Sequence, residues 1–166
     1  MGMSVTISAA TAQDAEQILK LQYLCYQSEA ELYGDYSIEP LTQTLDALRA
    51  ELAGGHGLVA RLGDEVVASV RGGVDASGTA RIAKLIVHPR MQRHGIGGRL
   101  LTAIEGKFAA DPAARRFQLF TGHRSEGNLR LYRSHGYVPV STERTGAVPV
   151  VTLEKEAGAG AYVKSA

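Results

Sequence analysis

The chain has 166 residues, 45% of them hydrophobic, and a formal net charge of +1. This length predicts one domain that buries its own core, and the single cysteine, Cys25, excludes an internal disulfide and fits a reducing, cytoplasmic compartment. No apolar stretch approaches the roughly 20 residues of a membrane span, so no membrane partner is expected.

The charged residues are unevenly distributed. Residues 81–99 carry five cationic side chains and no acid, whereas residues 21–48 carry five acids and no lysine or arginine. This asymmetry predicts two surfaces with different partners, the alternative being two ordinary solvated faces. The near-neutral total charge and the lack of aromatic residues within the basic stretch argue against a nucleic-acid partner.

The N-terminal third predicts one strand and two helices. Residues 5–8 alternate as a strand does, and Thr11 is the expected N-cap of a helix that carries Cys25 as a buried thiol and ends at Gly34. Pro40 is expected to open a second helix, which continues as far as the glycine pair at 54–55. One continuous stripe of leucines supports this helix, at positions 41, 45, 48 and 52.

The rest of the chain alternates strands and helices. Short turns join the first three strands into an antiparallel meander, and a helix that starts after a glycine-rich loop provides a crossover. The strands are expected at 58–62, 65–74, 81–87, 117–121, 138–141 and 148–155, and the helices at about 100–110 and 125–136. The predicted fold is therefore a mixed α/β domain of order β-α-α-β-β-β-α-β-α-β-β. It is an α+β arrangement with a mainly antiparallel sheet, spanning residues 1–156, with a tail at 157–166.

The loop between the third strand of the meander and the next helix is rich in glycine and arginine. It reads HPRMQRHGIGGRL over residues 88–100. The first amides of a helix have no partner within the helix and favour an anion, and glycines let a phosphate approach them, although a tight turn is the alternative. Neither the dinucleotide fingerprint nor the nucleoside-triphosphate loop fits, because Leu100 replaces the last glycine and no GxxxxGK[ST] occurs.

Two spaced motifs resolve this choice. Residues 92–97, QRHGIG, match Q/R-x-x-G-x-G/A and follow the apolar run 85–87 and Pro89, and residues 125–137, SEGNLRLYRSHGY, follow one strand later. Together they resemble the acetyl-CoA loop and the later helix of the GCN5-related N-acetyltransferase (GNAT) family, over roughly residues 4 to 155. The resemblance implies that fold, an acetyl-CoA donor and direct transfer of the acetyl group to a primary amine.

The resemblance also implies roles for individual residues. Loop amides hold the pyrophosphate, the strand edge at 85–87 pairs with pantetheine and offers an N–H to the oxyanion, and Tyr132 protonates the departing thiolate. From the residues alone, packing is the alternative role of Tyr132. The expected cofactor-binding residues are Leu85, Ile86, Val87, Gln92, Arg93, His94, Gly95, Ile96, Gly97, Gly98, Ser125 and Asn128.

The sequence departs from the family pattern at two positions. Ser125 stands where many members have asparagine, so either Ser125 or Asn128 is expected to reach the cofactor. Arg81 lies where many members have a glutamate, which leaves the general base open among three histidines and a water chain. Those histidines are His88, His123 and His135, and none has the spacing of a metal ligand pair.

The acceptor is expected to bind the acidic, tyrosine-rich segment, which also includes Tyr36. Acids interleaved with tyrosines attract a cationic amine, so the hypothesis is a small amino-bearing acceptor held by Tyr23, Tyr26, Glu29 and Tyr33. The alternative function is a non-catalytic acyl-CoA-binding or regulatory module of the same fold. The sequence leaves open the acyl chain and whether the chain is a monomer or a homodimer.

Overall fold

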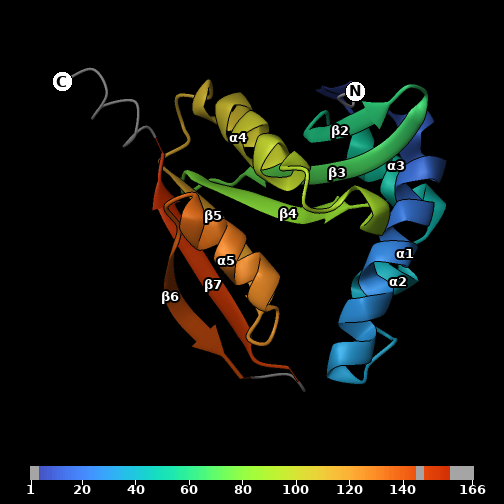
Figure 1. Ribbon diagram of the computed structural model, residues 1–166. Helices are drawn as coiled ribbons and strands as arrows, with labels where there is room; N and C mark the ends of the chain where they lie inside the picture. Colours follow the sequence, from blue (N-terminus) through green and yellow to red (C-terminus); the bar gives the residue numbers. More distant parts are fainter. Residues whose placement is uncertain (1–3, 145–147, 158–166) are drawn as a thin grey trace. The chain divides into compact units, whose positions relative to one another are not determined.

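The computed structural model describes residues 4–144 and 148–157, in two compact units. The first unit contains residues 4–71 and 84–104, and the second contains residues 72–83 and those from 105 onward. Two strands and one helix contribute to both units, because the chain changes unit within β3, β4 and α4 (Figure 1).

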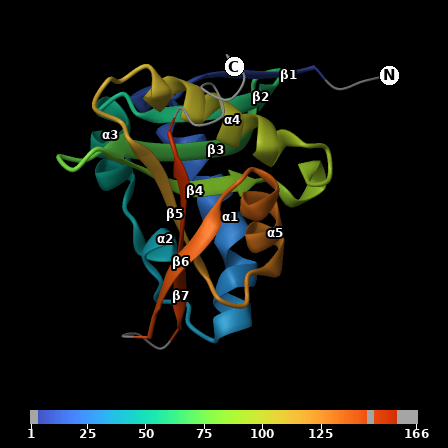
Figure 2. The same ribbon diagram turned by 90° about the vertical axis from the view of Figure 1, so that its left-hand side faces the viewer.

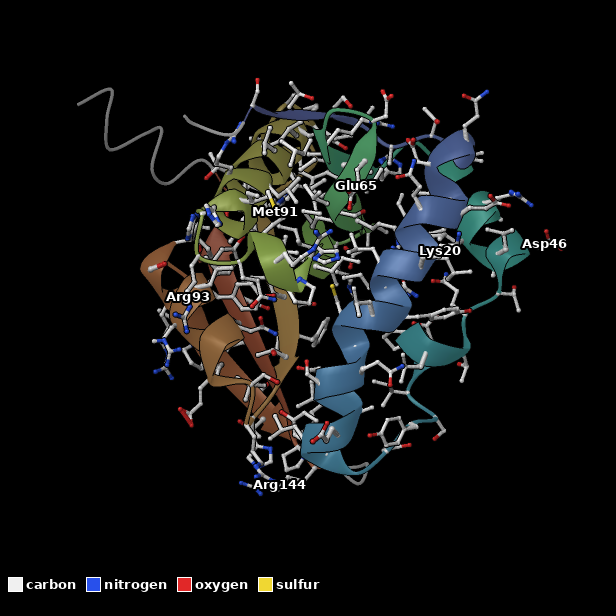
Figure 3. All side chains as sticks on the ribbon, turned by 45° about the vertical axis from the view of Figure 1, so that its right-hand side comes forward. Lys20, Asp46, Glu65, Met91, Arg93 and Arg144 are labelled. Atoms are coloured by element: carbon white, nitrogen blue, oxygen red, sulfur yellow. The ribbon has the colours of Figure 1, made fainter. Side chains whose placement is uncertain are left out.

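The first unit combines one edge of the sheet with three helices. Its core is formed by apolar residues of α1, α3, β2, β3 and β4, among them Ile18, Leu48 and Val59. The polar side chains of Lys20 and Asp46 point away from this core (Figure 3). The elements are β1 (Val5–Ala9), η1 (Ala12–Asp14), α1 (Ala15–Tyr33), α2 (Glu39–Thr42), α3 (Leu45–Ala53), β2 (Gly57–Leu62), β3 (Glu65–Val74), β4 (Thr79–Val87), η2 (Pro89–Met91) and the start of α4 (Ile96–Ala109).

The ends of the first helical segment follow the sequence signals. The Asp14 carboxylate accepts the Thr11 N–H at 2.8 Å, which satisfies a donor at the start of the segment. Gly34 has a φ of +67° and ends α1 in the left-handed conformation that glycine adopts without strain. The expected end at Gly34 is confirmed, whereas Thr11 caps the short turn η1 and Asp14 is the N-cap of α1.

The second expected helix is interrupted, and the prediction of one continuous element is wrong. Gln43 and Thr44 are extended, so the leucine stripe divides between α2 and α3. The Gln43 side-chain oxygen accepts hydrogen bonds from the side chains of Gln22 and Arg71. The Thr44 hydroxyl caps α3 by accepting the Ala47 N–H at 3.1 Å. These polar contacts accompany the break in the helix, and the spacing of the leucines does not predict them.

The second unit is built on β5 (Arg116–Gly122), β7 (Val150–Glu156) and β6 (Val138–Glu143), which lie side by side (Figure 2). It also contains α5 (Glu126–Ser134) and the end of α4. Glu105 on α4 accepts the Tyr137 hydroxyl at 2.6 Å and the Lys155 ammonium at 2.8 Å. These bonds join α4 to the chain after α5 and to β7.

The strands form a seven-stranded, mainly antiparallel sheet in the order β1-β2-β3-β4-β5-β7-β6. The exception is β4–β5, which is parallel at Thr79 and Arg116 because α4 provides the crossover. The predicted fold class is confirmed, with strand boundaries shifted by one or two residues. Only Ala157 of the expected tail lies within the described residues, and the single-domain boundary stays a prediction.

Gly72 in β3 tests the packing of the second unit. A Cβ there would collide with the Arg81 carbonyl and lie 2.9 Å from the Phe108 ring, whereas a Cβ at Gly73 would meet nothing within 4 Å. We expect Gly72→Ala to lower the free energy of unfolding by about 1–3 kcal/mol. Gly73→Ala, the neighbouring control, should change it by less than about 0.5 kcal/mol. Urea unfolding measures both, and equal effects would contradict this account of the packing.

Candidate functional site

The glycine loop is held at both ends and exposed in the middle. Met91 and Ile96 are buried, at 8% and 2% exposure, while residues 92–95 are exposed. Figure 3 marks Met91 and Arg93 on this loop. Arg93 and Gly95 have φ values of +69° and +76°, so the chain turns sharply before α4. The loop therefore presents its backbone outward between two buried anchors.

The start of α4 offers unpaired amides. Gly95 accepts the first helical bond, from the Arg99 N–H at 3.1 Å, so the amides of residues 95–98 precede the intrahelical ladder. Gly97 and Gly98 stand in the first turn and have no side chain to cover these groups. The helix dipole adds positive potential at the same place. This arrangement is able to hold a phosphate group.

Loop side chains bond to the loop's own backbone. The Gln92 amide donates to the Val87 carbonyl at 3.2 Å, and His94 Nδ1 lies 3.0 Å from the Gln92 carbonyl. Gln92 and His94, both expected to bind the cofactor, therefore stabilise the loop's conformation in this structure. Arg93 is exposed at the outer part of the turn.

The end of β4 is fixed from the core side. Ile86 is buried in the core, while Leu85 and Val87 are partly exposed. The Val87 carbonyl accepts the Cys25 thiol at 3.4 Å as well as the Gln92 amide. Burial raises the pKa of the Cys25 thiol to about 11, and the bond to Val87 lowers it by less. Cys25 is therefore a protonated, partly buried thiol beside the predicted donor strand, and the helical pattern does not predict its bond to Val87.

In the second unit, three predicted residues lie along one face of α5. Positions 125, 128 and 132 are separated by three and four residues, which places them on one side of a helix. Ser125 and Tyr132 are buried and Asn128 is half-buried. The Asn128 amide donates to the Thr121 hydroxyl at 3.3 Å, and the Tyr132 ring lies 6.2 Å from that of Tyr137. Ser125 occupies the N-cap position, but its side chain makes no capping bond.

The four predicted acceptor residues share one stripe of α1. Their positions fall within about 120° of the helix circumference. Tyr23, Tyr26, Glu29 and Tyr33 are all half-buried, and the Tyr23 hydroxyl donates to the Gln43 carbonyl at 2.7 Å. Tyr36, by contrast, is 57% exposed. The stripe is thus a partly covered surface of phenol rings with one carboxylate.

The three histidines considered as a base differ in their surroundings. His88 Nδ1 accepts the Arg90 N–H at 3.1 Å, and His135 Nδ1 lies 3.1 Å from the Leu131 carbonyl, so both rings are bonded to nearby backbone. The His123 backbone donates to the Pro149 carbonyl, and its side chain is exposed. Arg81 pairs with Asp75 at 3.3 Å across a turn. None of these contacts identifies a general base.

The two charged segments are less separate than their composition suggests. Lys84 of the basic segment pairs with Glu39 of the acidic one at 2.7 Å, and Arg90 pairs with Glu65 at 3.6 Å. The Arg99 guanidinium donates to the Val5 carbonyl. Local pairing therefore offsets much of the charge that the sequence concentrates at 81–99.

A buried polar cluster in the first unit has no counterpart in the sequence predictions. Arg71 on β3 is 2% exposed and Gln22 on α1 is fully buried, and both contact Gln43. Burial alone would raise the pKa of the Glu51 carboxyl, but Arg71, Gln43 and Lys84 together hold it below its ordinary value. Two sequence features could have indicated this cluster: Arg71 lies in a valine-rich strand, and Gln22 lies at an apolar position of the first helix.

Comparisons with known proteins agree on one family. The family model described as the acetyltransferase (GNAT) family matches residues 15–137. A comparison with curated protein sequences finds no match. No helix among residues 4–144 and 148–157 is long and apolar enough to cross a bilayer.

Three solved structures illustrate the likeness in fold. The PaiA N-acetyltransferase of Thermoplasma acidophilum, in complex with coenzyme A, has a TM-score of 0.78 at 17% identity, over 93% of this chain and 99% of that one. YncA of Salmonella typhimurium, with its cofactor acetyl-CoA, has a TM-score of 0.74 at 17% identity, over 92% and 94%. The ribosomal-protein-S18-alanine N-acetyltransferase of Escherichia coli has a TM-score of 0.75 at 14% identity, over 93% and 94%.

The Cys25 environment predicts low thiol reactivity. With a pKa of about 11, the thiolate fraction at pH 8 is roughly 100-fold below that of a thiol with the ordinary value of 9.0, and burial adds a steric barrier. We expect alkylation by iodoacetamide to be at least about 100-fold slower than that of glutathione at pH 8, and to accelerate as the pH rises toward 11. The urea-unfolded protein serves as the reactive control. A native rate equal to that control would contradict the described burial.

Proposed function

Because the chain belongs to the acetyltransferase (GNAT) family, we propose that it moves an acetyl group from acetyl-CoA to the primary amine of a small acceptor. The observation that carries the proposal is the glycine loop, with its exposed turn between two buried anchors and its open amides at the start of α4. Solved proteins of similar fold hold coenzyme A or acetyl-CoA, which supports the choice of donor.

The amides of residues 95–98 would bind the pyrophosphate of the donor. Backbone N–H groups at a helix start bind phosphate without needing a cationic side chain, and the exposed Arg93 adds charge nearby. The partly exposed edge at Leu85 and Val87 would pair with the peptide-like pantetheine arm. Ser125 or Asn128 on α5 would supply a further contact.

The reaction needs few groups. The neutral amine attacks the thioester carbonyl carbon, a C–N bond forms, and a backbone N–H at the end of β4 stabilises the oxyanion. The C–S bond then breaks, and the thiolate takes a proton from the Tyr132 hydroxyl to leave as coenzyme A. The amine loses one proton, through a water chain or one of the histidines, and this proton restores Tyr132. Atoms and charge therefore balance without a further reactant.

The stripe on α1 would receive the acceptor. Tyr23, Tyr26 and Tyr33 offer ring faces and Glu29 a negative charge, both of which attract an ammonium group before it is deprotonated. This supports a small amino-bearing acceptor. The cytoplasmic location, the oligomeric state and the absence of nucleic-acid and membrane partners stay predictions.

Tyr132→Phe separates an enzyme from a regulatory module. We expect turnover to fall about 10- to 100-fold while the affinity for acetyl-CoA is retained, because only the proton donor is removed. Thiol release from acetyl-CoA and calorimetric binding measure the two quantities. The control is Tyr137→Phe, which removes a buried hydroxyl bonded to Glu105 and should lower stability without this loss of turnover. Thiol release that is absent from the wild type with every amine, despite acetyl-CoA binding, would favour the regulatory module.

Gly97→Val tests the phosphate cradle. A branched side chain in the first turn of α4 would cover the amides, so acetyl-CoA affinity should fall at least about 10-fold. Gly106→Val, near the other end of the same helix and with open space around its Cβ, is the matched control and should leave affinity unchanged. Calorimetry measures affinity, and urea unfolding checks that both variants are folded. If Gly97→Val retains its affinity for acetyl-CoA, the loop is only a turn and does not bind the pyrophosphate.

A further inference from the structure

Three donors of the polar cluster in the first unit converge on one side-chain oxygen. The Gln43 side-chain oxygen receives three donors: the Gln22 amide at 3.0 Å, Arg71 Nη2 at 3.1 Å and Lys84 Nζ at 3.4 Å. A carbonyl oxygen has two lone pairs, so the three donors compete for it. The longest of the three bonds is that of Lys84, whose strong acceptor is instead the Glu39 carboxylate at 2.7 Å.

The Arg71 guanidinium has one unmet donor. Its Nε pairs with Glu51 at 2.7 Å and its Nη2 bonds to Gln22 and Gln43, but its buried Nη1 has no hydrogen-bond partner. The side chain is 3% exposed, so water does not compensate freely. An unmet donor on a buried cation is costly, and an anionic oxygen nearby would lower that cost.

Lys84 is the more exposed of the two cations in the cluster. Its side chain is 15% exposed, and its present partner, Glu39, is 62% exposed. An ion pair with so exposed a carboxylate is weak and can be exchanged for another. Lys84 also has a φ of +53° within β4, a conformation that is strained for a residue other than glycine. Backbone strain of this kind is typical of functional positions.

The position of Lys84 connects the cluster with the reaction. It immediately precedes Leu85–Val87, the strand edge assigned above to the donor. Tyr23 of the acceptor stripe bonds to the Gln43 carbonyl, so the stripe and the cluster share Gln43. An acceptor lying on that stripe would therefore have both an ammonium-attracting side and a cationic, donor-rich side within one unit.

We propose that the acceptor carries a carboxylate as well as its amine, and that this carboxylate binds Lys84 in place of Glu39. The inference rests on the proposed function and narrows its acceptor to amino acids and related amino carboxylates. Lys84 is the contacting residue. Arg71 and Gln43 are positioning residues, since Gln43 links Arg71 to Lys84 through one oxygen. Glu39 occupies the carboxylate position while no acceptor is bound.

Matched acceptors provide the first test. α-Amino acids, their carboxamides and the corresponding decarboxylated amines are compared by thiol release from acetyl-CoA at constant ionic strength. We expect kcat/KM to be about 10- to 100-fold higher for at least one acid than for its amide and its amine, as a charge-assisted bond gives. Equal values across each trio, with thiol release observed, would overturn the inference while leaving the proposed function intact.

Two variants give opposite expectations. Lys84→Met should raise KM for the acid about 10-fold or more and leave the amide unaffected, whereas Glu39→Gln should lower KM for the acid because it removes the competing carboxylate. The control is Glu65→Gln, which opens the exposed pair with Arg90 at 3.6 Å and should change neither. If the cluster has only a structural role, Lys84→Met and Glu39→Gln would both lower the unfolding midpoint and shift acid and amide alike, which overturns the inference.

Binding measured without acetyl transfer distinguishes the carboxylate site from the proposed activity. Calorimetric titration of the acids and amides into the chain, with coenzyme A in place of acetyl-CoA, measures recognition of the carboxylate alone. Tighter binding of an acid than of its amide, lost in Lys84→Met, supports the site even where no amine yields thiol release. Failure of thiol release with every amine overturns the proposed function, and equal binding of acids and amides overturns the carboxylate site.

Discussion

The first unit depends on accommodating one guanidinium inside its core. Arg71 stands in a strand that is mostly apolar apart from Ser69, and its side chain is almost completely buried. A cation in that position is tolerated only where acceptors surround it, so α1 contributes Gln22 and α3 contributes Glu51. Gln43 completes the set only because the chain is extended there. The break between α2 and α3 thus brings Gln43 to the arginine, at the point where Thr44 caps α3.

The glycine loop depends on a different constraint, the fixing of its backbone. Met91 and Ile96 anchor the turn in apolar surroundings, and Gln92 ties it to the last carbonyl of β4. The same carbonyl takes the Cys25 thiol from the core side. Two contacts on one oxygen restrict the rotation of the peptide unit after Val87. A backbone held in this way presents its amides in one arrangement, which is what recognition of a phosphate group requires.

The sequence predicts those parts of the fold that local chemistry determines. Gly34, the turn at Gly63 and the crossover after β4 each carry a local signal, and the structure has them in place. The interruption of the second helix has one local signal, the N-cap residue Thr44, whereas the partners of Gln43, Gln22 and Arg71, are distant in the sequence. The charge segments mislead for the same reason. A count of charges along the sequence treats the two segments as separate, whereas Lys84 and Glu39 form an ion pair in the folded chain.

Donor and acceptor place different demands on the sequence. Amides at the start of α4 exist whatever the side chains, so a loop of this kind needs little beyond its glycines and its anchors. This is consistent with folds that superpose at TM-scores of 0.74 to 0.78 while identity is only 14–17%. Recognition of an acceptor needs particular side chains, and fold likeness carries no information about them. Side chains such as Arg71, Gln43 and Lys84 lie outside the two motifs that carry the family resemblance, so acceptor recognition by this chain is best tested there.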